Sequence, residues 1–201
     1  MSTSPNIPVG WYRESQFTRP SKECREPEWW HTRDIQGTEV EVIEMVAGMI
    51  RGHQPDVVLE TGTSRGFMSQ AIGQALRQNG HGTLHTYEPD TDTLNEACRL
   101  WWTDDENEMV LPIVPYAQES MQEWTNGPID FAWHDSLIQL RQPEFEFYLE
   151  HYSERAIVCF HDTAAHFGPW SDRLRTALLS QGFSYLDWPS PRGAIIARKN
   201  P

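Results

Sequence analysis

The chain has 201 residues, of which 38% are hydrophobic and 11% aromatic, a composition typical of one globular domain rather than of a disordered segment. Its 29 acidic and 16 basic side chains give a formal net charge of -13, which repels phosphate backbones and disfavours nucleic acid as a general partner. No apolar run approaches the ~20 residues that a membrane span needs, so we expect no membrane partner.

The cysteines and the first residues predict a reducing setting. The chain has three cysteines, so one stays unpaired in any disulfide scheme, and none lies in a C-x-x-C pair. The first residues lack the apolar region of a signal peptide. We therefore expect a cytoplasmic protein, and the sequence leaves a homodimer open.

The predicted elements begin after a polar segment dotted with aromatic residues, which we expect to be an irregular N-terminal arm or lid over residues 1–35. From Gln36 to Gly52, apolar residues recur at steps of three and four, which predicts an amphipathic helix. We therefore expect one main domain over residues 36–201.

Strands and helices then alternate along the chain. Short apolar runs predict strands, and the segments between them carry the spacing of helices. The expected strands are 56–60, 83–88, 109–114, 129–133, 156–160, 183–188 and 193–199. The expected helices are 66–79, 91–102, 143–152 and 170–181. The last two strands are joined by a short connection and therefore predict an antiparallel hairpin.

This order of elements predicts an α/β fold of the Rossmann-like kind. We expect a seven-stranded, mostly parallel sheet with an antiparallel C-terminal hairpin and helices on both faces. In such sheets ligands bind beyond the carboxyl ends of the strands. Candidate functional residues are therefore sought at those ends.

The loop after the first of these strands carries two glycines, Gly62 and Gly66. A dinucleotide-binding loop normally carries three, because a pyrophosphate lies against bare backbone, so an NAD-dependent Rossmann enzyme is disfavoured. Glu60 ends the strand before the loop, and Glu88 ends the next strand. A carboxylate in the second position can accept hydrogen bonds from both hydroxyls of a ribose. The pattern suits S-adenosylmethionine, a nucleoside with cationic centres and no phosphate, although a tight turn alone would also use two glycines.

The segments LETGTSRG and TLHTYEPD, with SPRGAIIARK near the end, resemble the class I S-adenosylmethionine-dependent methyltransferases. Within them the chain is similar to the small O-methyltransferase-like group that includes catechol O-methyltransferase and the cephalosporin hydroxylase-like proteins. The resemblance covers residues 36–199. It implies a Rossmann-like methyltransferase fold, S-adenosyl-L-methionine as the methyl donor and a small-molecule acceptor.

The resemblance also assigns residues to the donor, at or just after the ends of the first four strands of the alternation. Glu60, Gly62, Ser64 and Gly66 would surround the methionine part, and Glu88 would hold the ribose. Ala117 and Gln118, after the third strand, would contact the adenine. The full set of assigned residues is Glu60, Gly62, Ser64, Gly66, Glu88, Ala117, Gln118 and Asp135.

Two His-Asp pairs follow the next two strands. His134-Asp135 ends the fourth strand, and His161-Asp162 ends the fifth. If these strands are neighbours, their ends lie about 5 Å apart. We therefore expect two carboxylates and two imidazoles to converge beside the methyl donor.

Three interpretations of these pairs stay open. Both aspartates could simply accept backbone N–H groups of the following turns. They could bind Mg²⁺ or another divalent cation; the resemblance implies ligands at Asp135 and Asp162, with Thr163 where relatives carry an asparagine. Alternatively, His134 or His161 could act as a general base without a metal.

Together these observations predict S-adenosylmethionine-dependent methyl transfer to a small molecule, at a hydroxyl. The expected catalytic residues are His134, Asp135, His161 and Asp162. Arg141 follows closely and is either an ordinary surface arginine or a clamp for a substrate carboxylate. Two alternatives stay open: a catalytically silent S-adenosylmethionine-binding module that serves in assembly, and an accessory protein of natural-product tailoring.

Overall fold

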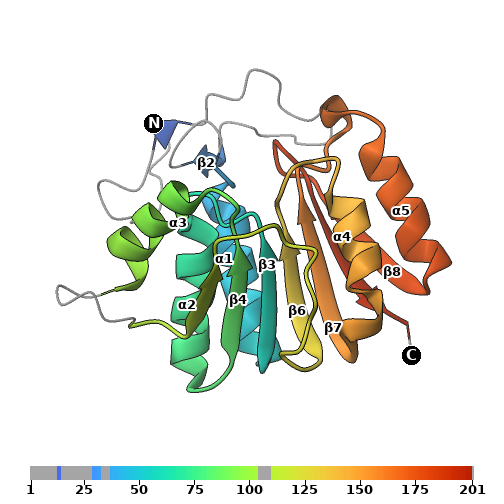
Figure 1. Ribbon diagram of the computed structural model, residues 1–201. Coiled ribbons are helices and arrows are strands. Elements are labelled where there is room, and N and C mark those ends of the chain that lie inside the picture. Colours follow the sequence, from blue (N-terminus) through green and yellow to red (C-terminus); the bar gives the residue numbers. More distant parts are fainter. Residues whose placement is uncertain (1–12, 15–28, 33–36, 104–109, 201) are drawn as a thin grey trace.

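Figure 1 shows the computed structural model, which describes residues 13–14, 29–32, 37–103 and 110–200. Most of the predicted N-terminal arm lies outside the described residues. So does the start of the strand predicted at 109–114.

A seven-stranded sheet forms the centre of the molecule, in the order β5-β4-β3-β6-β7-β9-β8. The strands from β5 to β7 pair in parallel, whereas β9 pairs antiparallel with both β7 and β8. The bounds are β3 (Val57–Thr61), β4 (Thr83–Tyr87), β5 (Ile113–Tyr116), β6 (Ile129–His134), β7 (Tyr152–His161), β8 (Phe183–Trp188) and β9 (Ala194–Lys199). The predicted mostly parallel sheet and its C-terminal hairpin are confirmed.

The helices cover both faces of this sheet. Their bounds are α1 (Val40–His53), α2 (Phe67–Asn79), α3 (Thr91–Ala97), α4 (Arg141–Phe147) and α5 (Trp170–Ser180). The single helix predicted over 91–102 changes at Cys98 into a π-helical turn that ends at Trp102. A separate pair of two-residue strands, β1 (Arg13–Glu14) and β2 (His31–Thr32), precedes α1.

Alternating side chains along the strands build two separate cores. Val58 and Phe131 belong to the core beneath α1, α2 and α3, and their neighbours Leu59 and Ala132 belong to the core beneath α4 and α5. Figure 1 shows α1 and α2 on one side of the sheet and α4 and α5 on the other. Near-continuous apolar runs are what a parallel strand buried on both faces requires.

One strand is longer than predicted. The sequence pattern places its start at Ala156, but β7 begins at Tyr152. Two of the extra residues are polar and bind the neighbouring strand: Ser153 Oγ and Arg155 Nε donate to Asp130 Oδ1 at 2.9 Å and 3.0 Å. A search for apolar runs misses a strand that pairs through polar side chains.

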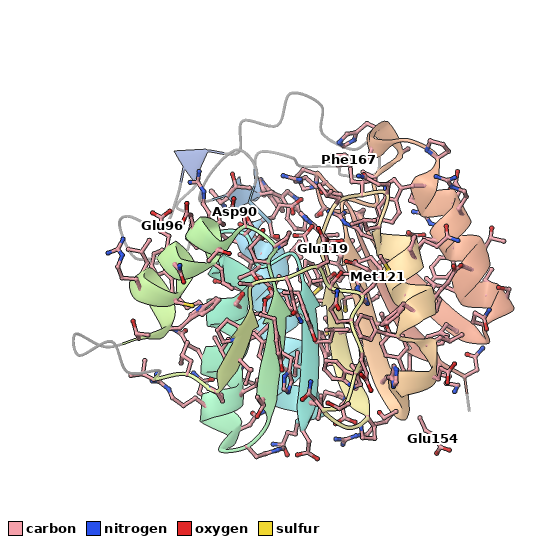
Figure 2. The ribbon with its side chains drawn as sticks, viewed as in Figure 1. Asp90, Glu96, Glu119, Met121, Glu154 and Phe167 are labelled. Atoms are coloured by element: carbon pink, nitrogen blue, oxygen red, sulfur yellow. The ribbon has the colours of Figure 1, made fainter. Side chains whose placement is uncertain are left out.

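The carboxyl ends of β3, β4, β6 and β7 meet at one edge of the sheet, because these strands are parallel. Figure 2 shows the side chains around this sheet and places Asp90 and Phe167 toward one end of the molecule and Glu154 at the other. Among the described residues, no helix has the length and apolar character required to cross a bilayer.

Candidate functional site

A cavity of about 490 Å³ opens at this carboxyl edge. Small-molecule pockets commonly measure about 300–1,000 Å³, so the cavity is large enough for a nucleoside-sized ligand. Its walls come from segments that follow different strands: Gly62–Arg65 after β3, Tyr87–Pro89 at the end of β4, Glu119–Ser120 after β5 and Asp135–Leu137 after β6. Leu140, Arg141, Glu144, Asp162 and Arg192 close the side nearest α4 and β7.

The loop after β3 is held between two strand ends. The backbone N–H groups of Gly62 and Thr63 both donate to the carbonyl oxygen of Tyr87, at 3.0 Å and 3.1 Å. Gly62 has a φ of 85°, and a Cβ at this position would lie 2.5 Å from the carbonyl oxygen of Asp135. Only glycine therefore allows the loop to pack this closely against the end of β6.

Gly66 has a different task from Gly62. It caps α2 with a φ of 73°, and a Cβ there would lie 2.9 Å from both Ala97 and the ring of Trp102. Gly66 is buried and does not line the cavity. The structure therefore places this predicted donor residue in the packing of α2 against the turn that follows α3.

Glu88 lies at the cavity wall, where the sequence places it. Its Oε2 accepts the backbone N–H of Ser64 at 2.9 Å, and its Oε1 accepts that of Asp90 at 3.1 Å. The carboxylate is thereby fixed at the mouth of the cavity, and each oxygen keeps a further lone pair for a ligand.

Glu60 is completely buried behind the loop and does not line the cavity. Its Oε2 accepts hydrogen bonds from Ser69 Oγ at 2.5 Å and Thr86 Oγ1 at 2.6 Å. Its Oε1 has no hydrogen-bond partner among the described residues. Burial raises the pKa of Glu60 to about 8, against the lowering effect of the two hydroxyl donors.

The two residues predicted to contact the adenine, Ala117 and Gln118, lie next to the cavity lining rather than in it. Ala117 and Gln118 are exposed and do not line the cavity, whereas Glu119 and Ser120 do. The reason is that the third strand ends at Tyr116 rather than at 114, so the chain returns to the sheet edge two residues later than expected.

Three of the four residues in the two His-Asp pairs, Asp135, His161 and Asp162, lie together as expected, and His134 does not. In the register of β6 and β7, His134 lies opposite Phe160, so that His161 is one position farther along. Side chains alternate along a strand, and a difference of one residue sends the two imidazoles to opposite faces of the sheet. His134 stacks on Phe160 with ring centroids 5.1 Å apart, and His161 packs near Trp133 at 5.7 Å.

His134 lies in the core beneath α4, away from the cavity. It is fully buried, its Nδ1 is 3.1 Å from Thr61 Oγ1, and its Nε2 is 2.9 Å from Tyr152 Oη. Glu144 Oε2 lies 3.5 Å from the same Nδ1. His134 itself does not line the cavity, so the structure does not support its predicted role as a base.

His161 is also buried, on the α1 side of the sheet. Its Nδ1 faces Asp135 Oδ1 at 3.2 Å, and its Nε2 faces Glu39 Oε2 at 2.7 Å. Two carboxylate acceptors require both ring nitrogens to carry protons. Burial alone lowers the pKa of His161, but Asp135, Asp162 and Glu39 outweigh it and raise the pKa to about 10. A charged imidazolium cannot accept a proton, so this geometry does not support the predicted role of His161 as a base either.

Two arginines neutralise the aspartates of these pairs. Arg141 Nη2 donates to Asp135 Oδ1 at 2.8 Å and to Asp162 Oδ2 at 3.0 Å. Arg192 binds Asp162 with Nε at 2.5 Å and Nη2 at 2.9 Å. Burial raises the pKa of Asp162, but His161 and Arg141 lower it well below its usual range. Arg141 is buried, so the expectation of an ordinary surface arginine is wrong, and the side chain lies in the cavity wall with its donors on the two aspartates.

The predicted metal site does not fit these contacts. Ligand atoms of Asp135, His161 and Asp162 lie within 4.8 Å of one another, which is close enough for a metal. However, the guanidinium of Arg141 bridges the two carboxylates, and Arg192 covers both oxygens of Asp162. Thr163 is buried outside the cavity lining, where a Cβ on Gly193 would come within 3.0 Å of its Oγ1.

Sequence reasoning missed several residues at this edge. Glu39 is fully buried and accepts the backbone N–H of Arg192 at 2.8 Å as well as binding His161. Glu144 is fully buried in α4 and accepts hydrogen bonds from Thr61 and Ser136 at 2.8 Å and 2.7 Å. Neither acid belongs to a recognisable motif in the sequence, and only the tertiary structure reveals their partners.

A sheet of this order with a ligand cavity at its carboxyl edge defines a Rossmann-like methyltransferase fold. A family model described as a methyltransferase domain matches residues 59–163, slightly more than half of the chain, and the chain belongs to this family. No curated protein matches the chain in sequence.

Solved structures share the fold at low sequence identity. The O-methyltransferase TomG of Streptomyces achromogenes, solved in complex with SAM, aligns with a TM-score of 0.68 and 16% identity over 83% of this chain and 82% of its own. The SAH-bound methyltransferase PaMTH1 of Podospora anserina gives 0.69 and 14% over 83% and 81%. The O-methyltransferase of Bacillus cereus in complex with SAH gives 0.66 and 16% over 83% and 84%.

Proposed function

We propose that this methyltransferase domain transfers the methyl group of S-adenosylmethionine to a hydroxyl of a small molecule. The observation that carries the proposal is the cavity, whose lining includes the Gly62 loop, Glu88 and Asp135. The three similar structures named above bind SAM or SAH according to their descriptions, and their shared fold is consistent with the same donor here.

On the donor side, the residues fit an uncharged ribose and a charged sulfonium. Glu88 would accept the ribose hydroxyls, because its two oxygens are already oriented by backbone donors. Gly62 and Ser64 would lie along the methionine part, and Glu119 and Ser120 along the adenine in place of Ala117 and Gln118. Glu60 would act from behind the loop, where its buried carboxyl group binds Ser69 and Thr86 and so supports the loop that faces the donor.

On the acceptor side, Asp135 is the group we assign to the proton. Its side chain is 17% exposed and lines the cavity, and Thr38 Oγ1 donates to its Oδ2 at 2.9 Å. A bond forms between the acceptor oxygen and the methyl carbon while the sulfur–carbon bond breaks, which leaves a neutral thioether. The hydroxyl proton passes to Asp135 and then to water. Holding the two reactants in line lowers the barrier, because their translational and rotational freedom is lost on binding rather than in the reaction.

The binding half of this proposal is tested by calorimetry with S-adenosylhomocysteine. We expect the wild-type chain to release heat and Gly62→Ala to lose affinity at least about tenfold, because the added Cβ would strike the backbone of Asp135. Gly80→Ala is the matched control: its φ is 78°, yet nothing lies within 4 Å of the new Cβ, so binding should persist. The absence of heat from the folded wild-type chain would refute the proposal.

The catalytic half is tested by turnover on a panel of hydroxyl compounds. Asp135→Asn should lower kcat by about 100-fold to 10,000-fold while S-adenosylhomocysteine still binds, because the variant loses the proton acceptor. Binding of S-adenosylhomocysteine without turnover on any acceptor would favour the silent assembly module. A melting-temperature increase with NADH instead would favour the NAD-dependent alternative.

A further inference from the structure

Two carboxylates, those of Asp135 and Asp162, lie close together at the ends of neighbouring strands and are 17% and 5% exposed. Like charges at this distance and burial need a counter-charge between them. A divalent cation is one solution, and the clustering of their oxygens with His161 is compatible with it on distance alone. The structure shows another solution.

The guanidinium of Arg141 lies between the two carboxylates. A single nitrogen, Nη2, reaches both Asp135 and Asp162, at 2.8 Å and 3.0 Å. The other donors are anchored on backbone: Nε donates to the carbonyl oxygen of Ser136 at 3.0 Å, and Nη1 donates to that of His161. Four of the five N–H groups of an arginine are therefore used within the protein. The side chain is 3% exposed and also packs over the ring of Trp170, so its position is built into the fold.

The charges around this guanidinium balance without an added ion. Three acids form the cluster, Glu39, Asp135 and Asp162, and three cationic groups pair with them, His161, Arg141 and Arg192. His161 is cationic because both of its ring nitrogens face carboxylates. A divalent ion would bring two uncompensated positive charges into a largely buried cluster, at a large desolvation cost.

We infer that Arg141 takes the place of a divalent cation between Asp135 and Asp162, so that this domain transfers methyl groups without a divalent metal. The exclusion of the metal rests on the contacts and charges of this cluster and does not depend on the proposed function. Its consequence for methyl transfer rests on the proposed function. Arg141 is a positioning residue here, because its N–H groups hold the two carboxylates in place. In this inference it does not bind the acceptor substrate, which would occupy the cavity beside them.

Mn²⁺ binding measured by electron paramagnetic resonance, without any methyl donor, tests the exclusion directly. We expect the wild-type chain to leave the free-ion signal unchanged. Arg141→Gln removes the guanidinium that bridges the two carboxylates. Arg192 stays on Asp162, but the cluster then holds one positive charge fewer than its three acids, so this variant should bind a single Mn²⁺ and gain melting temperature from it. The double variant Arg141→Gln with Asp162→Asn should lose that binding again, because one of the two carboxylates is gone.

Arg141→Lys distinguishes the effect of the positive charge at this position from the effect of the guanidinium contacts. It keeps a cation near the carboxylates, and we expect it, like the wild type, to bind no Mn²⁺. A folded Arg141→Gln chain that binds no Mn²⁺ would overturn the inference. If Arg141→Gln does not fold, Mn²⁺ binding by the wild-type chain is the test. The inference would be overturned if the wild-type chain bound one Mn²⁺ and Asp162→Asn abolished that binding.

Turnover in EDTA tests the second half of the inference. We expect the wild-type rate to be unchanged when EDTA is added, and a loss of turnover that Mg²⁺ restores would contradict the inference. Calorimetry with S-adenosylhomocysteine reports separately on the proposed function, so the two failures are distinguishable.

Discussion

The dipeptide His-Asp stands at the ends of two neighbouring strands of this molecule, and its histidine has different surroundings at each. His134-Asp135 ends β6, and His161-Asp162 ends β7. One histidine is stacked in the core under α4, between Thr61 and Tyr152. The other is the cation at the centre of an ion-pair cluster.

The difference teaches that register, more than residue type, decides what a strand-end residue does. A shift of one position separates the two imidazoles, because His134 pairs with Phe160 and His161 lies one residue beyond. On one face the imidazole meets hydroxyls and aromatic rings, and on the other it meets the carboxylates of Glu39 and Asp135. Only one of the four residues in the two pairs, Asp135, keeps the catalytic role predicted for it as part of our proposal.

The largest effect should come from removing the cationic histidine. His161→Gln leaves Glu39, which is fully buried, without its charged partner, and breaking a buried ion pair in this way typically costs about 3–5 kcal/mol. Urea unfolding at neutral pH measures the loss. The double variant with Glu39→Gln removes both charges and should recover part of it, whereas a single variant as stable as the wild type would show that His161 carries no charge.

The pH dependence of stability is a second test of the positive charge on His161. The pKa of His161 is raised to about 10 from an ordinary value near 6.5, so folding gains a proton-linked contribution. This contribution is fully present below about pH 6.5 and is lost as the pH rises toward and through about 10. Urea unfolding at several pH values should therefore show the gap between wild type and His161→Gln narrowing across that window. A gap that widens toward alkaline pH would contradict the assignment.

His134→Gln should cost less, about 1–3 kcal/mol, because it disturbs buried hydrogen bonds to Thr61 and Tyr152 without removing a cation from the carboxylate cluster. The variant should also leave the pH profile of turnover unchanged, since the histidine does not reach the cavity. Chemical denaturation and a pH–rate series measure the two effects. A kcat that falls with a displaced pH profile would restore His134 as a base.

Much of the fold could be predicted because its signals are local. The apolar runs of β3 and β6 and the helical spacing of α1 and α2 each lie in a single stretch of sequence, and short connections fix their order. The errors fall where polar pairing hides a strand, as at Ser153 and Arg155, or where the strand end is shifted, as at Tyr116.

In the site, as in the fold, the residues with local sequence signals could be predicted and those that depend on long-range contacts could not. Gly62 and Glu88 lie at the cavity, and both follow directly from strand ends that the sequence shows. The ion-pair cluster could not be predicted, because its members come from distant parts of the chain: Glu39 before α1, Arg141 at the start of α4 and Arg192 in the final hairpin. Nothing in a local pattern states which carboxylate a given arginine will meet.

The smallest expected effect is that of Thr38→Val, a variant that tests why Asp135, unlike Asp162, stays available to a substrate. Asp162 is bound through both oxygens by Arg192, whereas the Oδ2 of Asp135 receives a neutral donor, Thr38 Oγ1, at 2.9 Å. Thr38→Val removes this one hydrogen bond and should cost about 0.5–1.5 kcal/mol of unfolding free energy. It should also lower kcat, because the proposed proton acceptor loses its orientation.

Thr176→Val is the matched control for this change. Its hydroxyl is exposed in α5 and donates to the carbonyl oxygen of Asp172 at 2.9 Å, far from the cavity lining, so neither stability nor kcat should change appreciably. Equal effects of Thr38→Val and Thr176→Val on kcat would mean that the Thr38 hydroxyl does not orient Asp135. The proton would then have to leave by a route that does not depend on how this carboxylate is held.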